Sequence, residues 1–403
     1  MTDTLLRRAP FRRYWAAQTV SLFGDQVTLL AMPLLAVLAV GAGPAEMGYL
    51  TAAALLPNLL FSMSAGAWVD RHPNRRRLMI GADLGRAALL LAIPLLWWAD
   101  HLTLTVLYAV AFAAGTLSML FEVAHSSLFA TLVERPDYVA ANSLINGSRA
   151  MSYVAGPSAG GLLVQVFTAP FALLADVLTF LASAAFLRRV EVAERPTESV
   201  ERSGNGLRFV LTHPVLRAIL LGTTTLNLFN YIFAALFVLY VTTRLHIAPG
   251  TLGVIVGLGA VGGLLGAGLA GPLSRRIGIG PALILGLIVF PAPLILVPLA
   301  HGPQRVVVAM LFLAEFGAAL GVMLLDIAAG SVQTAATPAH RLAVVAGVNR
   351  TINYGIRPIG AVLGGTLGAF LGVRPALWIA TVGALLGVVW VWFSPVRELR
   401  RIQ

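Results

Sequence analysis

Long apolar segments recur along the chain, and polar residues gather between them. Residues 102–121 and 279–303 contain no Asp, Glu, Lys or Arg. A helix rises about 1.5 Å per residue, so a segment of ~20 residues crosses a hydrocarbon layer about 30 Å thick. The short polar–apolar alternation of barrel strands is absent, and helices satisfy their own backbone hydrogen bonds in lipid. The pattern predicts an all-α membrane protein.

Repeated segments of this length predict twelve transmembrane helices. We expect spans near residues 14–40, 47–69, 78–98, 103–128, 139–165, 170–187, 215–241, 250–273, 280–300, 305–330, 342–372 and 375–394.

The second half of the chain repeats features of the first half. The recurring pairs are Pro44 and Pro249, Gly48 and Gly253, and Gly66 and Gly271, all 205 positions apart, and Pro157 and Pro358, which are 201 apart. Six spans in each half make the repeats parallel, related by an axis along the membrane normal. We therefore expect two pseudo-symmetric six-helix bundles, residues 1–188 and 214–403, joined by a cytoplasmic linker, residues 189–213.

Charge follows the predicted topology. Of 403 residues, 58% are hydrophobic and 11% charged, whereas a soluble domain has about 25% charged residues. The net charge is +11, yet 20 arginines lie on the side that holds both termini. The opposite side holds Arg244, Arg305 and Arg374. This bias predicts cytoplasmic termini and explains the basic charge without nucleic acid.

The loop after the second predicted span contains a recognisable motif. Residues 66–77 read GAWVDRHPNRRR, which resembles the G-x-x-x-D-R-x-G-R-R motif of the major facilitator superfamily. Here Pro73 and Asn74 replace the second glycine, and the second-half copy, GPLSRRIG, lacks the Asp. Residues 11–15 and 23–25, FRRYW and FGD, look like the branch that contains enterobactin exporters and macrolide efflux pumps.

The resemblance implies that this loop is a cytoplasmic gate that latches the two halves. Its residues here are Gly66, Asp70, Arg71, Arg75 and Arg76. The Asp70 carboxylate is expected near the start of the next helix, where the positive end of the helix dipole and neighbouring arginine side chains stabilise a negative charge. The alternative is a positively charged loop with an incidental Asp.

The fifth predicted span carries an antiporter-like motif. Its residues Gly156, Pro157 and Gly160 resemble the end of G-x8-G-x3-G-P-x2-G, while Ser143 and Ser152 replace the first two glycines. The resemblance implies export, whereas ordinary packing of small residues is the alternative.

Two soluble-enzyme motifs also match by spacing. Residues 156–160 fit G-x-S-x-G and residues 257–262 fit G-x-G-x-x-G. Neither follows a strand, so we interpret both as packing glycines inside helices.

Charges inside predicted spans are the strongest functional signals. Each costs about 2.5–3.5 kcal/mol on insertion scales unless it is paired or hydrated. Asp25 lies ~16 Å into the first span, and Arg149 and Glu315 reach similar depth in spans five and ten. In the resembled family, spans one, four, seven and ten line the cavity, so Asp25 and Glu315 are expected to face one another across it.

Asp25 is our first candidate for proton coupling and Glu315 the second. The alternative for either acid is a structural ion pair, for example between Asp25 and Arg149.

Weaker candidates lie in other spans. Glu122 is a third proton-coupling candidate, since it shares a helical face with His125, although a hydrogen bond at the cytoplasmic mouth is the alternative. In span three, Asp83 and Arg86 are expected to pair with each other. In span seven, polar residues are expected to line a substrate cavity: Asn227, Asn230 and Tyr231. Four other charged residues are expected to hold helices together, and the last of them is also a candidate anion contact: Asp176, Asp326, Arg350 and Arg357.

These features predict a proton-coupled exporter of small amphipathic molecules that works by alternating access. No nucleotide-binding motif or cysteine is present, so we expect an ion gradient as the energy source, no cofactor or metal, and no enzymatic activity. We expect a monomer whose partners are lipid, protons and a small-molecule substrate. Its expected location is the plasma membrane, which for a bacterial protein is the inner membrane. An uptake symporter on the same fold and a non-transporting membrane sensor are the alternatives.

Topology gives the first testable prediction. Because the arginine bias orients the chain, tags at either terminus or within residues 190–210 should be reached only from the cytoplasm. Tag accessibility in intact and permeabilised cells measures this. Labelling of any of the three tags in intact cells would show the topology to be wrong.

Overall fold

The computed structural model describes the backbone of residues 2–71, 74–191 and 206–400. Side chains are described over the same ranges except at residues 2–4, 62–65, 67, 70 and 71. Within this part the chain forms helices and no strand. It divides into two compact units, Met1–Ala42 with Ala53–Val200 and Ala248–Val254, and Gly43–Ala52 with Glu201–Ile247 and Ile255–Gln403.

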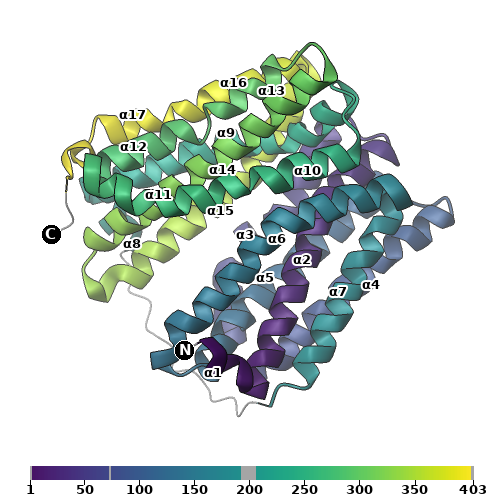
Figure 1. Ribbon diagram of the computed structural model, residues 1–403, viewed down its shortest axis with the longest axis horizontal. Helices are drawn as coiled ribbons and strands as arrows, with labels where there is room; N and C mark the ends of the chain where they lie inside the picture. The colour runs from purple at the N-terminus through teal and green to yellow at the C-terminus, as the bar shows by residue number, and fades with distance from the viewer. Residues whose placement is uncertain (1, 72–73, 192–205, 401–403) are drawn as a thin grey trace. The chain divides into compact units, whose positions relative to one another are not determined.

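Unit 1 is built around α2, which packs between α6 and α7, while α4 packs against α5 and α7 (Figure 1). Its core contains Tyr14, Met79, Phe121 and Leu128. The helices of this part of the chain are α1 (Thr2–Arg7), α2 (Ala9–Leu38), α3 (Pro44–Arg71), α4 (Arg75–Trp98), α5 (Leu104–Leu132), η1 (Arg135–Asp137), α6 (Tyr138–Phe167) and α7 (Ala169–Arg188).

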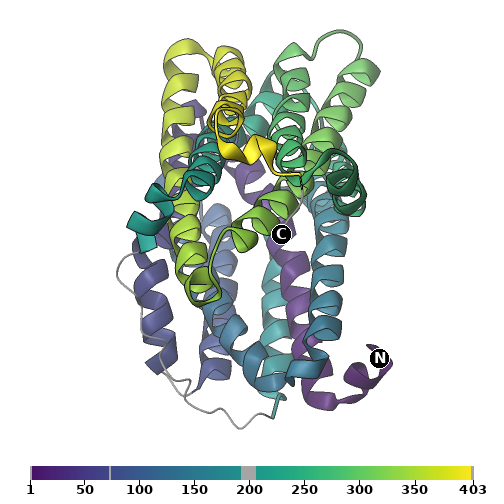
Figure 2. The ribbon, with the colours of Figure 1, turned by 90° about the vertical axis from the view of Figure 1, so that its left-hand side faces the viewer.

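Unit 2 is a second bundle, in which α15 packs against α9 while α11 and α12 pack against α14; its helices are green to yellow in Figure 2. The helices of this part of the chain are α8 (Gly206–Thr212), α9 (Pro214–Thr243), α10 (Pro249–Gly259), α11 (Val261–Ile277), α12 (Ile279–Val289), η2 (Pro293–Ile295), α13 (Leu296–Leu299), α14 (Gln304–Ala335), η3 (Ala339–Arg341), α15 (Leu342–Leu371), α16 (Val373–Leu385), α17 (Gly387–Trp392) and η4 (Pro395–Glu398).

The predicted fold class is confirmed. Among the described residues, nine helical segments are long and apolar enough to cross a membrane. They fall on nine of the expected ranges, and α3, α6 and α15, of 28, 30 and 30 residues, fall on the other three. The division into residues 1–188, 189–213 and 214–403 stays a prediction, because residues 192–205 lie outside the described part.

Prolines explain where the helices begin and where one of them breaks. Pro44 and Pro249 are the first residues of α3 and α10, a position that needs no backbone N–H. In the ninth expected span, α12 ends at Val289 and a short 3₁₀ turn follows. Pro291 and Pro293 lie at this break, and each lacks the N–H of a helical hydrogen bond.

Glycines allow helix backbones to approach closely in both units. In unit 1, a Cβ on Gly161 would lie 2.8 Å from the Cα of Gly253. In unit 2, a Cβ on Gly48 would lie 2.7 Å from the Cα of Gly365. Because bilayer lipid gives little hydrophobic drive between helices, such close packing is a main source of their association.

The glycines of the G-x-G-x-x-G match also pack helices together. A Cβ on Gly259 would meet the Cβ of Glu315 at 2.6 Å, and one on Gly262 would meet the Phe316 carbonyl at 2.1 Å. Both contacts are with α14, so the interpretation as packing glycines is confirmed.

Two glycines of α11 give a matched test of this packing. A Cβ on Gly266 would lie 2.4 Å from the Leu320 carbonyl oxygen, whereas a Cβ on Gly268 has nothing within 4 Å. Gly266→Ala should therefore force α11 and α14 apart and lower the melting temperature by several degrees, because overpacking costs typically 1–3 kcal/mol. Gly268→Ala should leave it unchanged or slightly raise it. Equal melting temperatures of the two purified variants would contradict the packing.

Candidate functional site

A buried ion pair on α4 forms the base of the candidate site. Asp83 and Arg86 are one helical turn apart, and the Arg86 Nη2 donates to the Asp83 Oδ1 at 2.5 Å. Residues three apart share a helix face, which explains why this pair could be predicted from spacing. The prediction is confirmed. The two side chains are only 2% and 0% exposed, so the pair is closed off from its surroundings.

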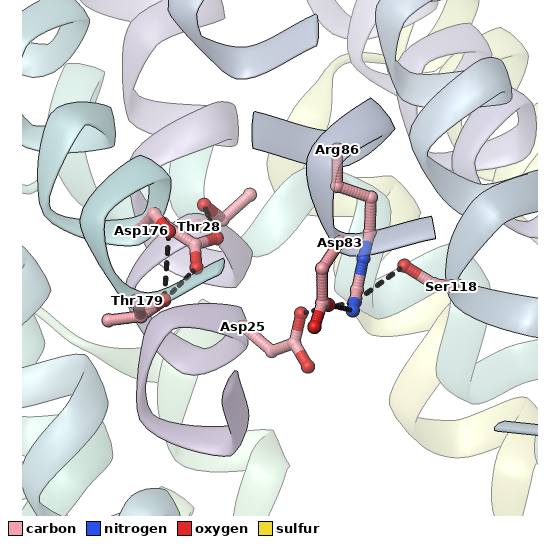
Figure 3. A network of polar contacts seen from close by, with 7 residues as sticks. All are labelled: Asp25, Thr28, Asp83, Arg86, Ser118, Asp176 and Thr179. Atoms are coloured by element: carbon pink, nitrogen blue, oxygen red, sulfur yellow. Dashed lines mark hydrogen bonds and ion pairs between the residues drawn. The ribbon is translucent and has the colours of Figure 1, made fainter. Parts of the chain in front are cut away.

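Asp25 of α2 is a second carboxylate on the same guanidinium. Its Oδ1 lies 3.2 Å from the Arg86 Nη1, which also donates to the Ser118 hydroxyl of α5 at 3.3 Å (Figure 3). Unlike Asp83, the Asp25 side chain is 40% exposed. Asp25 lies 16 residues after the start of the 30-residue α2, roughly 24 Å along a helix of about 45 Å. The shared guanidinium is therefore deep within a membrane-spanning segment.

Two aromatic rings hold the Arg86 guanidinium in place. Its carbon lies 4.0 Å from the ring centre of Phe180 on α7 and 4.7 Å from that of Phe121 on α5. The negative faces of aromatic rings attract a cation, most strongly where water is excluded. Arg86 is thus fixed by four helices.

A third carboxylate, Asp176 of α7, lies beside this cluster (Figure 3). It accepts hydrogen bonds from Thr28 at 2.5 Å and from Thr179 at 2.8 Å, and it has no ion-pair partner among the described residues. A Cβ on Gly24 would lie 1.9 Å from the Asp176 Oδ1. The glycine before Asp25 therefore makes room for this buried acid.

The structure shows Asp25 in an ion pair, as the alternative expected, but the partner suggested for it, Arg149, was wrong. Asp25 pairs with Arg86, and Arg149 has no ion-pair partner in the described part of the chain. The reason lies in the orientation of α2. Gly156 and Gly160 of α6 pack against Gln26 and Val27, so α2 presents these neighbouring positions to α6 and presents Asp25 to α4.

The antiporter-like motif is a helix contact in this structure. Pro157 lies inside α6, and Gly156 and Gly160 provide the close approach to α2. This contact is the packing alternative of the sequence analysis. The further link of these residues and Arg149 to antiport stays a prediction.

His125 of α5 makes polar contacts with α2 and not with Glu122. Its Nδ1 lies 2.6 Å from the Tyr14 hydroxyl and also contacts the Gln18 amide, and the Tyr14 ring stacks on the imidazole. Glu122 is exposed and makes no hydrogen bond or ion pair among the described side chains. The pattern therefore located a real polar contact at His125 but missed its partners, and a proton role for Glu122 stays a prediction.

The structure describes part of the loop predicted to form the cytoplasmic gate. Arg75 is buried, and Arg76 donates to the Val190 backbone carbonyl. Gly66 lies within α3, near its end. The side chains of Asp70 and Arg71 lie outside the described part of the structure. The latch therefore stays a prediction.

In unit 2, Glu315 of α14 packs against Gly259 of α10 and has no ion-pair partner in the described part of the chain. Asn227 of α9 donates to Asn353 of α15 at 3.1 Å. Asn230 is half-buried on the same helix, and Tyr231 lies beneath the Arg357 guanidinium. That Asp25 and Glu315 face one another stays a prediction, since they belong to different units.

Comparison with known proteins identifies the family. The sequence profile of the Major Facilitator Superfamily matches residues 14–357, and an overlapping match covers residues 219–402. This chain belongs to the Major Facilitator Superfamily. The resemblance seen in the sequence is confirmed, and the chain is a multi-pass membrane transporter.

Relatives include two proteins named "Multidrug efflux pump Tap". The one from Mycolicibacterium fortuitum is 28% identical, covering 99% of this chain and 98% of its own. The one from Mycobacterium tuberculosis H37Rv is 30% identical, covering 93% and 91%. Among solved structures, a bacterial homologue of the iron transporter ferroportin in an inward-facing state has a TM-score of 0.74 at 17% identity, covering 96% of this chain and 98% of its own. That likeness shows the fold alone.

The site predicts that its two carboxylates differ in structural importance. Asp83→Asn should replace the shorter, fully buried contact of Arg86 with an uncharged one and lower stability by about 3–5 kcal/mol, because Asp25, partly exposed and 3.2 Å away, compensates the buried charge only in part. Asp25→Asn should fold nearly as well as the wild type, since its side chain is partly exposed. Melting temperature and yield of purified protein measure both effects.

A matched comparison is the double variant Asp83→Asn with Arg86→Gln, which also removes the buried cation that has lost its closest partner and should recover part of the lost stability. Similar stability losses in Asp25→Asn and Asp83→Asn would contradict the distinction.

Proposed function

We propose that this transporter is a proton-coupled exporter of small amphipathic molecules and that Asp25 carries the coupling proton. The observation that best supports this proposal is the imbalance of charge at Arg86. Two carboxylates and one guanidinium lie together in the middle of membrane-spanning helices. One of the two negative charges is left without compensation. A lone charge in a membrane-spanning segment is costly, and a bound proton removes it.

Asp25 is the carboxylate better suited to exchange this proton. Asp83 is fully buried and has the shorter contact with Arg86, 2.5 Å against 3.2 Å. Asp25 is partly exposed, so a proton or a substrate cation can reach it. Arg86 holds the site together in either protonation state, because Asp83 and the two phenyl rings keep it in place when Asp25 is neutral.

The direction of transport is inferred from the relatives and from the sequence. The two relatives described above are named multidrug efflux pumps and are aligned over more than nine-tenths of their length. The antiporter-like motif around Gly156 supports the same direction. In the proposed cycle, protons enter from outside, neutralise Asp25, and release the substrate outward by alternating access. Glu315 is the second candidate for this role.

The cellular setting is also part of the proposal. The arginine bias supports cytoplasmic termini, and the bacterial relatives support a place in the inner membrane. We propose that the protein works as a monomer, since one chain supplies both halves of the repeat.

The central prediction concerns Asp25→Asn. Asn has nearly the same shape but cannot bind a coupling proton at neutral pH, so uphill transport should fall to the level of vesicles that lack the protein. The measurement is pH-driven accumulation of ethidium in inside-out vesicles with an acidic lumen. Downhill exchange of ethidium across vesicles without a pH difference should survive, because substrate can still bind.

Glu315→Gln is the matched control, because it removes the other mid-helix acid. Wild-type accumulation by well-expressed Asp25→Asn, together with loss in Glu315→Gln, would transfer the proton role to Glu315. The rival functions give other results with the wild type. A symporter accumulates its substrate in right-side-out vesicles with acid outside, and a sensor binds ligand without moving it.

A further inference from the structure

One face of α15 carries two arginines and their polar partners. Asn353, Tyr354 and Arg357 lie three, four and seven residues after Arg350, which places all four on one side of the helix. Arg357 lies 15 residues after Leu342, the first residue of this 30-residue helix. That is roughly 22 Å along a helix of about 45 Å. Arg357 is therefore near the middle of its span.

Contacts within unit 2 fix the position of the Arg357 guanidinium. Its Nε donates to the Asn227 Oδ1 of α9 at 3.2 Å, and the Asn227 amide donates to Asn353 at 3.1 Å. The guanidinium carbon lies 3.9 Å from the Tyr354 ring centre and 5.1 Å from that of Tyr231. Stacking on the rings and the hydrogen bond donated by Nε orient the guanidinium. Its two terminal nitrogens make no hydrogen bond among the described residues.

No carboxylate forms an ion pair with Arg357 among the described residues, although Asp326 of α14 attracts it electrostatically from a longer distance. All three ion pairs among the described residues lie in unit 1. The acids of α14, Glu315 and Asp326, are not within ion-pair distance of Arg357. Arg350 adds a second cation, 5.5 Å from the same Tyr354 ring. A charge without an ion pair inside a membrane-spanning segment is costly, and such residues often mark ligand pathways. This cluster is therefore a candidate binding site for an anionic ligand.

The cluster lies on the side of α15 away from its lipid-facing residues. Ile359, Leu363 and Phe370 are exposed apolar side chains, typical of a helix face in contact with lipid. At about 100° per residue, Ile359 is roughly 200° around the helix from Arg357. Arg357 is itself half-buried, so it is open to a ligand on the inner face of the helix.

We propose that Arg357, held by Asn227 and Tyr354, binds the carboxylate or phosphate group of an amphipathic substrate. The two terminal nitrogens match the two oxygens of such a group in a bidentate contact, and the tyrosine rings pack against its apolar body. That this anion is a transported substrate rests on the proposed export function. The mid-helix depth of Arg357 favours a substrate over a lipid headgroup, which lies at the membrane surface.

The test uses probes that share one apolar body and differ in charge: dansylglycine, its uncharged amide, and cationic dansylcadaverine. Binding to the full chain in phosphatidylcholine nanodiscs is measured by fluorescence anisotropy. The wild type should bind dansylglycine roughly tenfold more tightly than the amide, as expected for a hydrogen bond to a charged group. Arg357→Gln should abolish this preference by weakening dansylglycine alone, and Arg357→Lys should keep part of it.

Arg276→Gln is the matched control, since Arg276 is exposed in the last turn of α11, and it should keep the preference. The proposal is overturned if the wild type shows no charge preference, or if folded Arg357→Gln retains it. It is also overturned if Arg357→Gln weakens all three probes equally, which would indicate a structural role. Loss of the preference in phosphatidylglycerol nanodiscs would assign the site to a lipid headgroup instead. Equilibrium binding needs no gradient, so a failure of export in vesicles is a separate result.

Discussion

The arrangement of unit 1 depends on a guanidinium buried within membrane-spanning helices. Arg86 is 2% exposed, and a cation in that position is tolerated only when other groups replace water around it. Asp83 on its own helix, Ser118 and Phe121 on α5, and Phe180 on α7 do so, and Asp25 of α2 completes the set. One charge thus requires four helices to keep fixed positions around it. Asp25, the carboxylate proposed to bind the coupling proton, gains a rigid and partly accessible place as a result.

Glycine provides the complementary constraint, since it decides how near the helices lie. Gly24 leaves space for the buried Asp176. Gly156 and Gly160 bring α6 against the neighbouring positions of α2. The orientation of α2 that turns Asp25 toward Arg86 is therefore supported by small residues on the opposite contact. Packing and electrostatics support the same orientation.

The two units differ in the charges that make up the polar cluster described in each. In unit 1, Asp25 and Asp83 share one guanidinium, and Asp176 lies beside this cluster with hydrogen bonds from Thr28 and Thr179. In unit 2, Arg350 and Arg357 stack on Tyr354 and form no ion pair with an acid in the described structure. A repeated architecture thus carries different chemistry in its two copies, as a transporter needs if one half handles protons and the other contacts substrate.

The sequence by itself determined the helices, their approximate bounds and the class of protein, because spans are long local features whose hydropathy is set by consecutive residues. It also determined the Asp83–Arg86 pair, since residues three apart on a helix must share a face. It did not determine that Asp25 joins Arg86, 61 positions away, or that Asp176 lies beside them. No periodicity links these residues, and the pairing suggested by equal depth, Asp25 with Arg149, was wrong. Depth follows from counting residues along a helix, but the direction in which a side chain points follows from the rotation of that helix against its neighbours. That rotation was decided by tertiary packing at glycines such as Gly24, Gly156 and Gly160.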